Sequence, residues 1–202
     1  KYDSVIADTN QRMRQFGVTA DDAQKAIADL RQSLSQFDTL GASTRDNLID
    51  LVTGLEQIGV SGADSSGMIN SLNKSFDVSI DRATELTRDM AMSGEALGKT
   101  SSQMVKDYNK TLGTLAVYGT KSVKIFKDIA AMAATAGVEV DDMMGIANKF
   151  DTFADSAKTA AKMNAILGTS FSGNNLMMMD HNKRIEHVIS GIQKAGVAFK
   201  NL

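Results

Sequence analysis

Residues 93–100, Ser-Gly-Glu-Ala-Leu-Gly-Lys-Thr, come nearest in this chain to a motif that does chemistry. They differ from the phosphate-binding pattern G-x-x-x-x-G-K-T only at Ser93, which stands where the pattern has glycine. In that motif a buried strand leads into a loop whose N–H groups surround the phosphates, and threonine holds magnesium where a helix begins. Residues 81–90 instead have the pattern of an amphipathic helix. The sequence favours a helix that ends at Gly94 and a second helix capped by Thr100, with a nucleotide site as the weaker alternative.

Other reactive side chains are few and poorly placed to act together. Gly168 and Gly173 repeat the glycine spacing of the motif, but Asn174 follows where lysine is needed. His181 and His187 are six residues apart, which puts them on roughly opposite sides of a helix, so they are poor joint ligands for a metal. We expect no catalytic residue, no metal and no cofactor.

The remaining candidates for catalysis are carboxylates. The adjacent pairs at 21–22 and 141–142 stand where first-turn acids of helices are expected, because negative charge is favoured there. The chain has no cysteine and no Gly-x-Ser-x-Gly segment. Carboxylates from distant helices can still meet in space, as in helical glycosidases, so a helical cell-wall-degrading enzyme stays an alternative.

A recurring turn sequence divides the chain into four units of about 40 residues. Gly-Val-Thr at 17–19 returns as Gly-Val-Ser at 59–61, as Gly-Lys-Thr at 98–100 and as Gly-Val at 137–138. Apolar residues at helical spacing follow each copy, and a period near forty is typical of stacked helical hairpins. We predict an all-α fold, an array of antiparallel helical hairpins with eight helices in four units, plus terminal helices.

Side chains at the starts and on the apolar faces of these helices define the prediction further. The expected N-caps are Thr19, Ser43, Ser61, Ser79, Thr100 and Thr120. The residues expected to carry the core are Leu30, Leu51, Leu55, Leu72, Phe126 and Ile129. Three domains follow: a helical lead-in at 1–16, the hairpin array at 17–168, and a loop with a C-terminal helix at 169–202 that runs from about Asp180 to Gly196.

Residues 169–179 break the regular pattern and combine turn-forming residues with large apolar ones. Methionine is flexible and adapts to varied partners. We therefore take five residues as a candidate interaction surface: Phe171, Leu176, Met177, Met178 and Met179. The alternative is that these side chains form core that closes the last hairpin.

Composition limits the classes of partner. The chain has no proline and a net charge of −2, so it favours helices and has no excess of positive charge for a nucleic acid or an anionic membrane. The longest apolar stretch, residues 129–138, is about half of what a bilayer span requires. We expect no specific nucleic acid partner and no transmembrane span. Because the chain starts with Lys1, we expect an excerpt of a longer protein.

Four ordered segments in the second half resemble a known family. They are residues 117–126 (VYGTKSVKIF), 136–138 (AGV), 145–153 (GIANKFDTF) and 161–168 (AKMNAILG). This block, over about residues 97 to 195, is similar to tail tape measure and related structural proteins of contractile-tailed bacteriophages. The chain departs from the family pattern after Gly168, where residues 170–173 replace a turn that contains proline.

The resemblance implies a virion structural protein without catalytic residues. A tape measure protein is a helical protein packed inside the tail tube, where it governs tail length and assembly, contacts the baseplate hub and is released at infection. The implied partners are tail tube and baseplate hub proteins and further copies of the chain, as a trimer or hexamer. The implied location is the virion, after synthesis in the cytoplasm of the bacterial host. A helical-repeat adaptor that binds other proteins is the alternative that the residues alone support.

Overall fold

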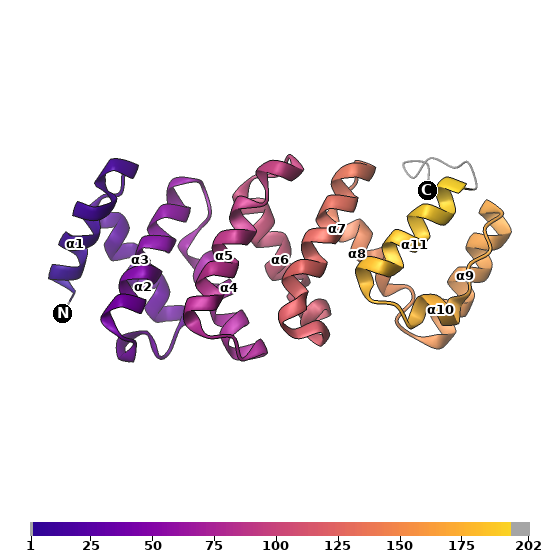
Figure 1. The fold of residues 1–202 in the computed structure, drawn as a ribbon, viewed down its shortest axis with the longest axis horizontal. Coiled ribbons are helices and arrows are strands. Elements are labelled where there is room, and N and C mark those ends of the chain that lie inside the picture. The colour runs from indigo at the N-terminus through magenta and orange to yellow at the C-terminus, as the bar shows by residue number, and fades with distance from the viewer. Residues whose placement is uncertain (1, 195–202) are drawn as a thin grey trace. The chain divides into compact units, whose positions relative to one another are not determined.

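A computed structural model of the protein describes residues 2–194, and every regular element within them is a helix (Figure 1). The all-α class predicted from the sequence is confirmed. Packing divides the chain into two compact units, residues 1–123 (unit 1) and residues 124–202 (unit 2). This division differs from the boundaries predicted at residues 16 and 168.

Unit 1 consists of helices joined by short turns. Its α-helices are α1 (Asp3–Met13), α2 (Ala20–Ser33), α3 (Ala42–Gln57), α4 (Gly62–Phe76), α5 (Ile80–Met92) and α6 (Ser101–Leu115). Four short 3-10 helices lie between or after them, η1 (Arg14–Phe16), η2 (Phe37–Thr39), η3 (Glu95–Leu97) and η4 (Ala116–Lys121).

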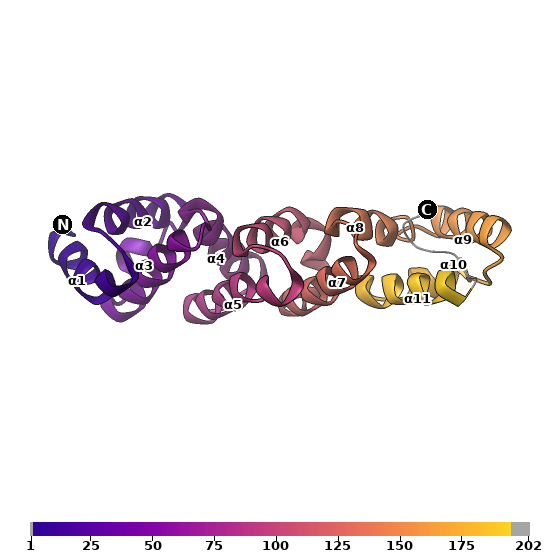
Figure 2. The same cartoon turned by 90° about the horizontal axis from the view of Figure 1, so that it is seen from above.

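Helices two positions apart in unit 1 lie against each other. Helix α2 contacts α4 and α4 contacts α6, while α1 contacts α3 and α3 contacts α5. Contacts between consecutive helices from α1 to α6 join the two series, which Figure 2 shows from above. Such layered packing is typical of helical repeats, in which each pair buries its apolar stripe on its neighbours. Four equivalent hairpins remain a prediction, since unit 2 is arranged differently.

The repeated turn sequence has a physical explanation in the backbone. Gly17 has a φ of 82°, in the left-handed region that glycine adopts without strain. Val18 follows with its side chain buried, and the Thr19 hydroxyl accepts a hydrogen bond from the N–H of Asp22 at 3.2 Å. The Asp22 carboxylate in turn accepts from the N–H of Thr19 at 2.8 Å, which completes a capping box. The first two copies, at Gly17 and Gly59, therefore end one helix, bury a valine side chain and start the next helix.

Most of the predicted N-caps are confirmed, and two are wrong. The side chains that accept a capping hydrogen bond as predicted are those of Thr19, Ser61, Ser79 and Thr100. Helix α3 starts instead after Gly41, which places Ser43 inside the helix. Thr120 lies within η4, where Gly119 has a φ of 55° and a ψ of −132°, so the next helix starts only at Ser122. Glycine and an irregular turn replace the expected side-chain caps at these two sites.

The first predicted helix is shorter than its apolar stripe. Helix α2 ends at Ser33, because Leu34 has an extended backbone with a φ of −108° and a ψ of 99°. Leu34 and Phe37 are nevertheless fully buried. The turn carries these two side chains into the core in place of further helix. All six residues predicted to carry the core, from Leu30 to Ile129, are buried.

Unit 2 has helices of less regular length. They are α7 (Ser122–Ala136), whose first two residues belong to unit 1, α8 (Val140–Asn148), α9 (Phe153–Leu167), α10 (Gly173–Met177) and α11 (His181–Lys194). Helix α8 packs against α11, while α9 packs against α10. The core between them consists of Phe150, Ala160, Phe171, Leu176, Val188 and Ile192. The predicted end of the last helix at Gly196 lies outside the described residues.

Candidate functional site

The segment that resembles a phosphate-binding loop is a turn between α5 and α6. The N–H of Lys99 donates to the carbonyl of Gly94 at 3.0 Å, and a Cβ at Gly94 would lie only 2.7 Å from the carbonyl oxygen of Lys99. Gly98 has a φ of 67°. The chain therefore folds back on itself at this point, as it does at the other copies of the repeated turn, and residues 2–93 contain no strand that could precede it.

The side chains that a nucleotide would need are already bonded within the protein. The Lys99 ammonium group donates to the carboxylate of Asp107 at 3.2 Å, and both side chains are largely buried. The Thr100 hydroxyl accepts from the N–H of Gln103 at 3.2 Å in a capping box. Lys99 occupies the position that valine has in the first two copies of the turn. A charged side chain is tolerated at this buried position because it forms an ion pair with Asp107.

The five residues proposed as an interaction surface are divided between core and exterior. Phe171 and Leu176 are buried in the core of unit 2, so the prediction that they are surface residues is wrong. Met177 and Met179 are half-buried, while Met178 is 77% exposed. The difference in exposure arises at the end of α10, where Leu176 in the helix is buried and its C-cap residue, Met178, is exposed. The role of the three methionines in binding stays a prediction.

Phe171 is fixed from two sides. Asn164 on α9 donates from its amide to the carbonyl of Phe171 at 2.9 Å and accepts from the N–H of Phe171 at 2.7 Å. The phenyl ring lies 5.9 Å from the ring of His187 and against Gly191 on α11. Phe171 thus belongs to the core, although it lies in a loop of turn-forming residues, because Asn164 satisfies both of its backbone polar groups.

A cluster that the sequence analysis missed lies where α8, α10 and α11 meet. Arg184 is 3% exposed, and its guanidinium group donates to the Asp151 carboxylate at 2.6 Å. It also donates to four backbone carbonyls, those of Ala147, Leu176, Met177 and Met179, at 2.6 to 3.2 Å. These carbonyls lie at or just after the C-terminal ends of α8 and α10, where fewer intrahelical donors are available. Arg184 therefore holds two helix ends together.

His181 lies one turn before Arg184 on the same face of α11. Its side chain is 5% exposed, and Nε2 lies 3.2 Å from the amide oxygen of Asn148 and 3.7 Å from Asp151. Burial and the nearby charge of Arg184 lower the pKa of His181, against the opposite influence of Asp151 and Asp180. His187, by contrast, is exposed. Within residues 2–194 no three metal-binding side chains converge.

A sequence signal for this cluster exists. His181 and Arg184 lie on the stripe that continues with Ile185, Val188 and Ile192, at the spacing of one helix face. Two polar residues on an otherwise apolar stripe indicate a buried polar network, since an unpaired buried charge is strongly unfavourable.

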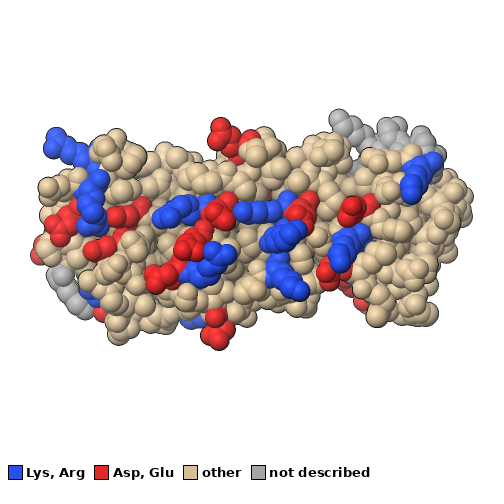
Figure 3. Space-filling model, in the orientation of Figure 1, with Lys and Arg blue, Asp and Glu red and all other residues tan. Residues whose placement is uncertain are grey.

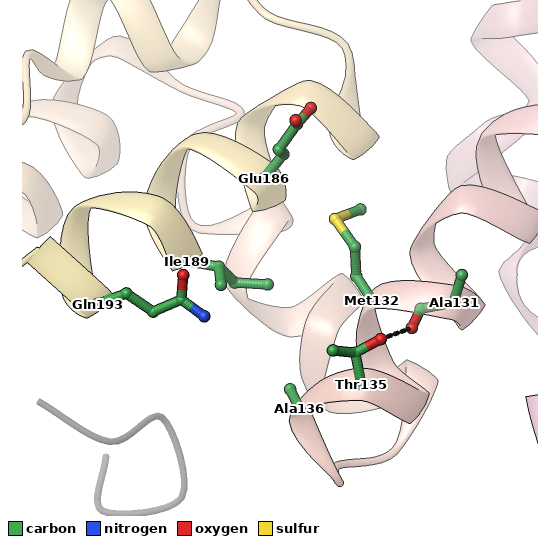
Figure 4. Close-up of a pocket in the computed structure, with 7 residues that line it drawn as sticks. All are labelled: Ala131, Met132, Thr135, Ala136, Glu186, Ile189 and Gln193. Carbon is green, nitrogen blue, oxygen red and sulfur yellow. Dashed lines mark hydrogen bonds between the residues drawn. The ribbon is translucent and has the colours of Figure 1, made fainter.

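A shallow groove of about 270 Å³ lies between α7 and α11 (Figure 4). Its lining comes from Ala131, Met132, Thr135 and Ala136 on α7 and from Glu186, Ile189 and Gln193 on α11. The Thr135 hydroxyl is turned back to donate to the carbonyl of Ala131 at 2.9 Å. With one carboxylate and mostly apolar walls, the groove offers packing surface and no converging set of reactive groups.

Charges of both signs occur on one face of the described residues (Figure 3). On the face in Figure 3, Lys and Arg side chains alternate with Asp and Glu, and no broad area carries a single sign. Exposed pairs such as Arg82 with Glu85 and Lys124 with Asp128 contribute to this pattern. A mixed surface gives no general attraction for a polyanion. Among the described helices, none combines the length and the apolar character that a membrane span needs.

Comparison of the chain with protein-family models, with curated proteins and with solved structures gave no match.

Proposed function

We propose that this chain is part of a virion structural protein of a contractile-tailed bacteriophage, similar to tail tape measure proteins. The observation that carries the proposal is the ordered block of family-like segments between residues 117 and 168. The fold uses three glycines of this block as turns, since Gly119, Gly137 and Gly168 have φ values of 55°, 68° and 67°. The block thus combines family-like sequence with positions at which glycine is physically required.

Packing between small residues supports a structural role. Helix α7 is rich in alanine from Ala130 onward, and Ala130 and Ala133 are fully buried. Small side chains allow helices to approach closely, as close packing in a narrow tube requires. The partners in this proposal are tail tube and baseplate hub proteins, with further copies of the chain in a trimer or hexamer. The protein is made in the host cytoplasm, enters the virion and is released at infection, with no cofactor.

The helix lengths bear on how such a segment contributes to tail length. A single continuous helix adds about 1.5 Å per residue, so 202 residues would add about 300 Å. The longest described helix, α3, has 16 residues and spans about 24 Å. Because consecutive helices in unit 1 pack side by side, their lengths do not add up. We infer that this segment contributes much less tail length per residue than an extended helix does.

Tail length after duplication of the segment tests this role. The codons for residues 1–202 are duplicated in frame in the phage that encodes the chain, and tails are measured by electron microscopy. We expect longer tails, with an increase well below 300 Å. A recoded gene with an unchanged protein sequence is the control. Complete tails of unchanged length from the duplicated gene would contradict a role in setting length.

The contact pattern of unit 1 also favours a second candidate, a helical-repeat adaptor for other proteins. Contacts between helices two positions apart, such as α2 with α4 and α4 with α6, are those of repeat arrays that bind partner peptides. Such an adaptor acts as a monomer. A single folded monomer in sedimentation at micromolar concentration would favour the adaptor, whereas a trimer or hexamer would favour the tail component.

A further inference from the structure

We propose that His181 is a pH-sensitive latch: when its imidazole takes up a second proton, the start of α11 separates from the end of α8 and loosens residues 176–179. This inference is independent of the phage assignment, since it rests only on contacts within unit 2.

The latch consists of a buried imidazole between two helix ends. His181 is the first residue of α11, and Asn148 is the last residue of α8. The amide oxygen of Asn148 can only accept, so in the 3.2 Å contact the imidazole Nε2 is the donor. A neutral imidazole serves this contact without placing a charge in the core of the unit.

A second proton on His181 would meet an unfavourable environment. The side chain is 5% exposed, the Arg184 guanidinium group lies on the same helix face, and the N-terminus of a helix disfavours positive charge. Asp151 and Asp180 favour the charged form, but Asp151 is already bonded to Arg184 at 2.6 Å and is partly exposed. Burial and Arg184 outweigh them, which lowers the pKa of His181.

The other elements around α11 add one further charge close to the latch. On α7, Asp128 accepts from the amide of Asn182 at 2.9 Å and is paired with Lys124 at 2.8 Å. Helix α10 carries no titratable side chain. The acids of α8, Asp141 and Asp142, lie in its first turn, at the end opposite to Asn148. Apart from Asp180 and Asp151, which favour the charged form, the neighbouring acids are thus either paired or remote from the imidazole.

Protonation is coupled to the methionine segment through Arg184. His181 and Arg184 lie one turn apart, and Arg184 bonds the carbonyls of Leu176, Met177 and Met179. Displacement of the first turn of α11 therefore removes the donor that holds residues 176–179. Since Leu176 is in the core and Met178 is exposed, opening would join them into one apolar surface.

The sign of the pH dependence follows from the lowered pKa. Above about pH 6.5, the ordinary value for histidine, the imidazole is neutral in both the closed and the open form and contributes no pH dependence. As the pH falls below about 6.5, the ordinary pKa of histidine, the open form binds a proton before the closed form does. The free energy that favours the closed form therefore decreases until the pH reaches the lower pKa of His181 in that form.

Hydrogen exchange on the whole chain at pH 7.5 and pH 5 tests the latch. After correction for intrinsic exchange rates, we expect a several-fold loss of protection at pH 5 in peptides that cover residues 176–192. His181→Gln, which keeps an amide donor and cannot become charged, should lose this pH dependence. His187→Gln changes the only other histidine, an exposed one, and should retain it. Equal loss of protection in wild type and His181→Gln, or none in wild type, would overturn the proposal.

A second variant covers the case in which His181→Gln opens unit 2 at both pH values. Asn148→Asp gives the charged imidazole a carboxylate partner at the same position, so the loss of protection at pH 5 should become smaller than in wild type. An unchanged or larger loss in Asn148→Asp would also overturn the latch. The imidazole NMR signals, assigned with the two histidine variants, should show a midpoint for His181 below 6.5.

Discussion

At the scale of single residues, unit 2 depends on one buried cation. Arg184 donates to four carbonyls at or just after the ends of α8 and α10 and pairs with Asp151. No other residue type presents as many donors in a fixed fork, so lysine is a poor substitute. Arg184 therefore has a structural role, in which its hydrogen bonds join the ends of α8 and α10, although a charged residue is usually found at the surface.

Arg184→Met should lower the free energy of unfolding of unit 2 by about 3 kcal/mol, because it removes the hydrogen bonds to four backbone carbonyls and the ion pair with Asp151. Arg184→Lys should recover less than half of that loss. Urea unfolding followed by circular dichroism measures both. Lys183→Met removes an exposed cation from the preceding position and should change stability by no more than about 0.5 kcal/mol. If the stability change for Arg184→Met is as small as that of Lys183→Met, the structural role of Arg184 is refuted.

Tyr108 gives unit 1 an alkaline pH dependence. Its hydroxyl lies 2.9 Å from that of Ser122, the side chain is fully buried, and burial raises the pKa of Tyr108 to about 12. In the unfolded chain the tyrosine ionises near pH 10, its ordinary pKa, while in the folded unit it stays neutral to about pH 12. The free energy of unfolding is therefore unaffected below pH 10 and falls by up to about 3 kcal/mol between pH 10 and 12. Tyr108→Phe should show a smaller loss of stability over this range in urea titrations. If the free energy of unfolding of Tyr108→Phe falls as steeply with pH as that of wild type, the assignment is contradicted.

At the scale of helices, two glycines differ in how closely other residues pack against them. A Cβ at Gly191 on α11 would lie 2.3 Å from the ring of Phe171, whereas a Cβ at Gly145 on α8 meets nothing within 4 Å. Asn164 holds the backbone of Phe171, so the ring cannot withdraw easily. Gly191 thus provides the space in which Phe171 closes the core.

Gly191→Ala should destabilise unit 2 by about 1–3 kcal/mol, since overpacking exceeds the gain in helix propensity. Gly145→Ala should stabilise it by up to about 1 kcal/mol, because only the propensity changes. Thermal unfolding of the two variants side by side gives the comparison. Equal effects of both substitutions would mean that Phe171 does not pack against α11.

The local elements were more predictable than their assembly. The turn of Gly17, Val18 and Thr19 could be read from the sequence, because glycine, an apolar anchor and a capping hydroxyl each act within a few residues. The burial of Phe171 could not, since it depends on Asn164 and on a glycine twenty residues further on. The Arg184 cluster also joins three helices, and sequence spacing shows only its position on the stripe of α11.

At the scale of the whole molecule, packing divides the chain at residue 123. The division was not predicted, because the repeated turn sequence continues through Gly137 and the apolar stripes continue with it. What changes is the partner of each helix: α8 packs on α11 and α9 on the short α10. Tertiary contacts of this kind leave no periodic signal in the sequence.

Leu51→Asp tests the packing of unit 1. Leu51 on α3 is buried, and a carboxylate there loses its hydration without a partner, which should unfold the helices of this unit. Circular dichroism should show a large loss of helix. Asn47→Asp introduces the same charge at an exposed position of α3 and should leave the spectrum unchanged. An unchanged melting curve for Leu51→Asp would contradict the assignment of α3 to the core.

Quantitative mass spectrometry of purified phage particles tests the central claim, membership of the virion tail, most directly. In particles of a contractile-tailed phage whose genome carries the coding sequence, peptides from unit 1 and unit 2 are measured against the tail tube protein. The account predicts both sets at the same small fixed number per tail, three or six copies. Peptides found in the infected cell but missing from purified particles would contradict it.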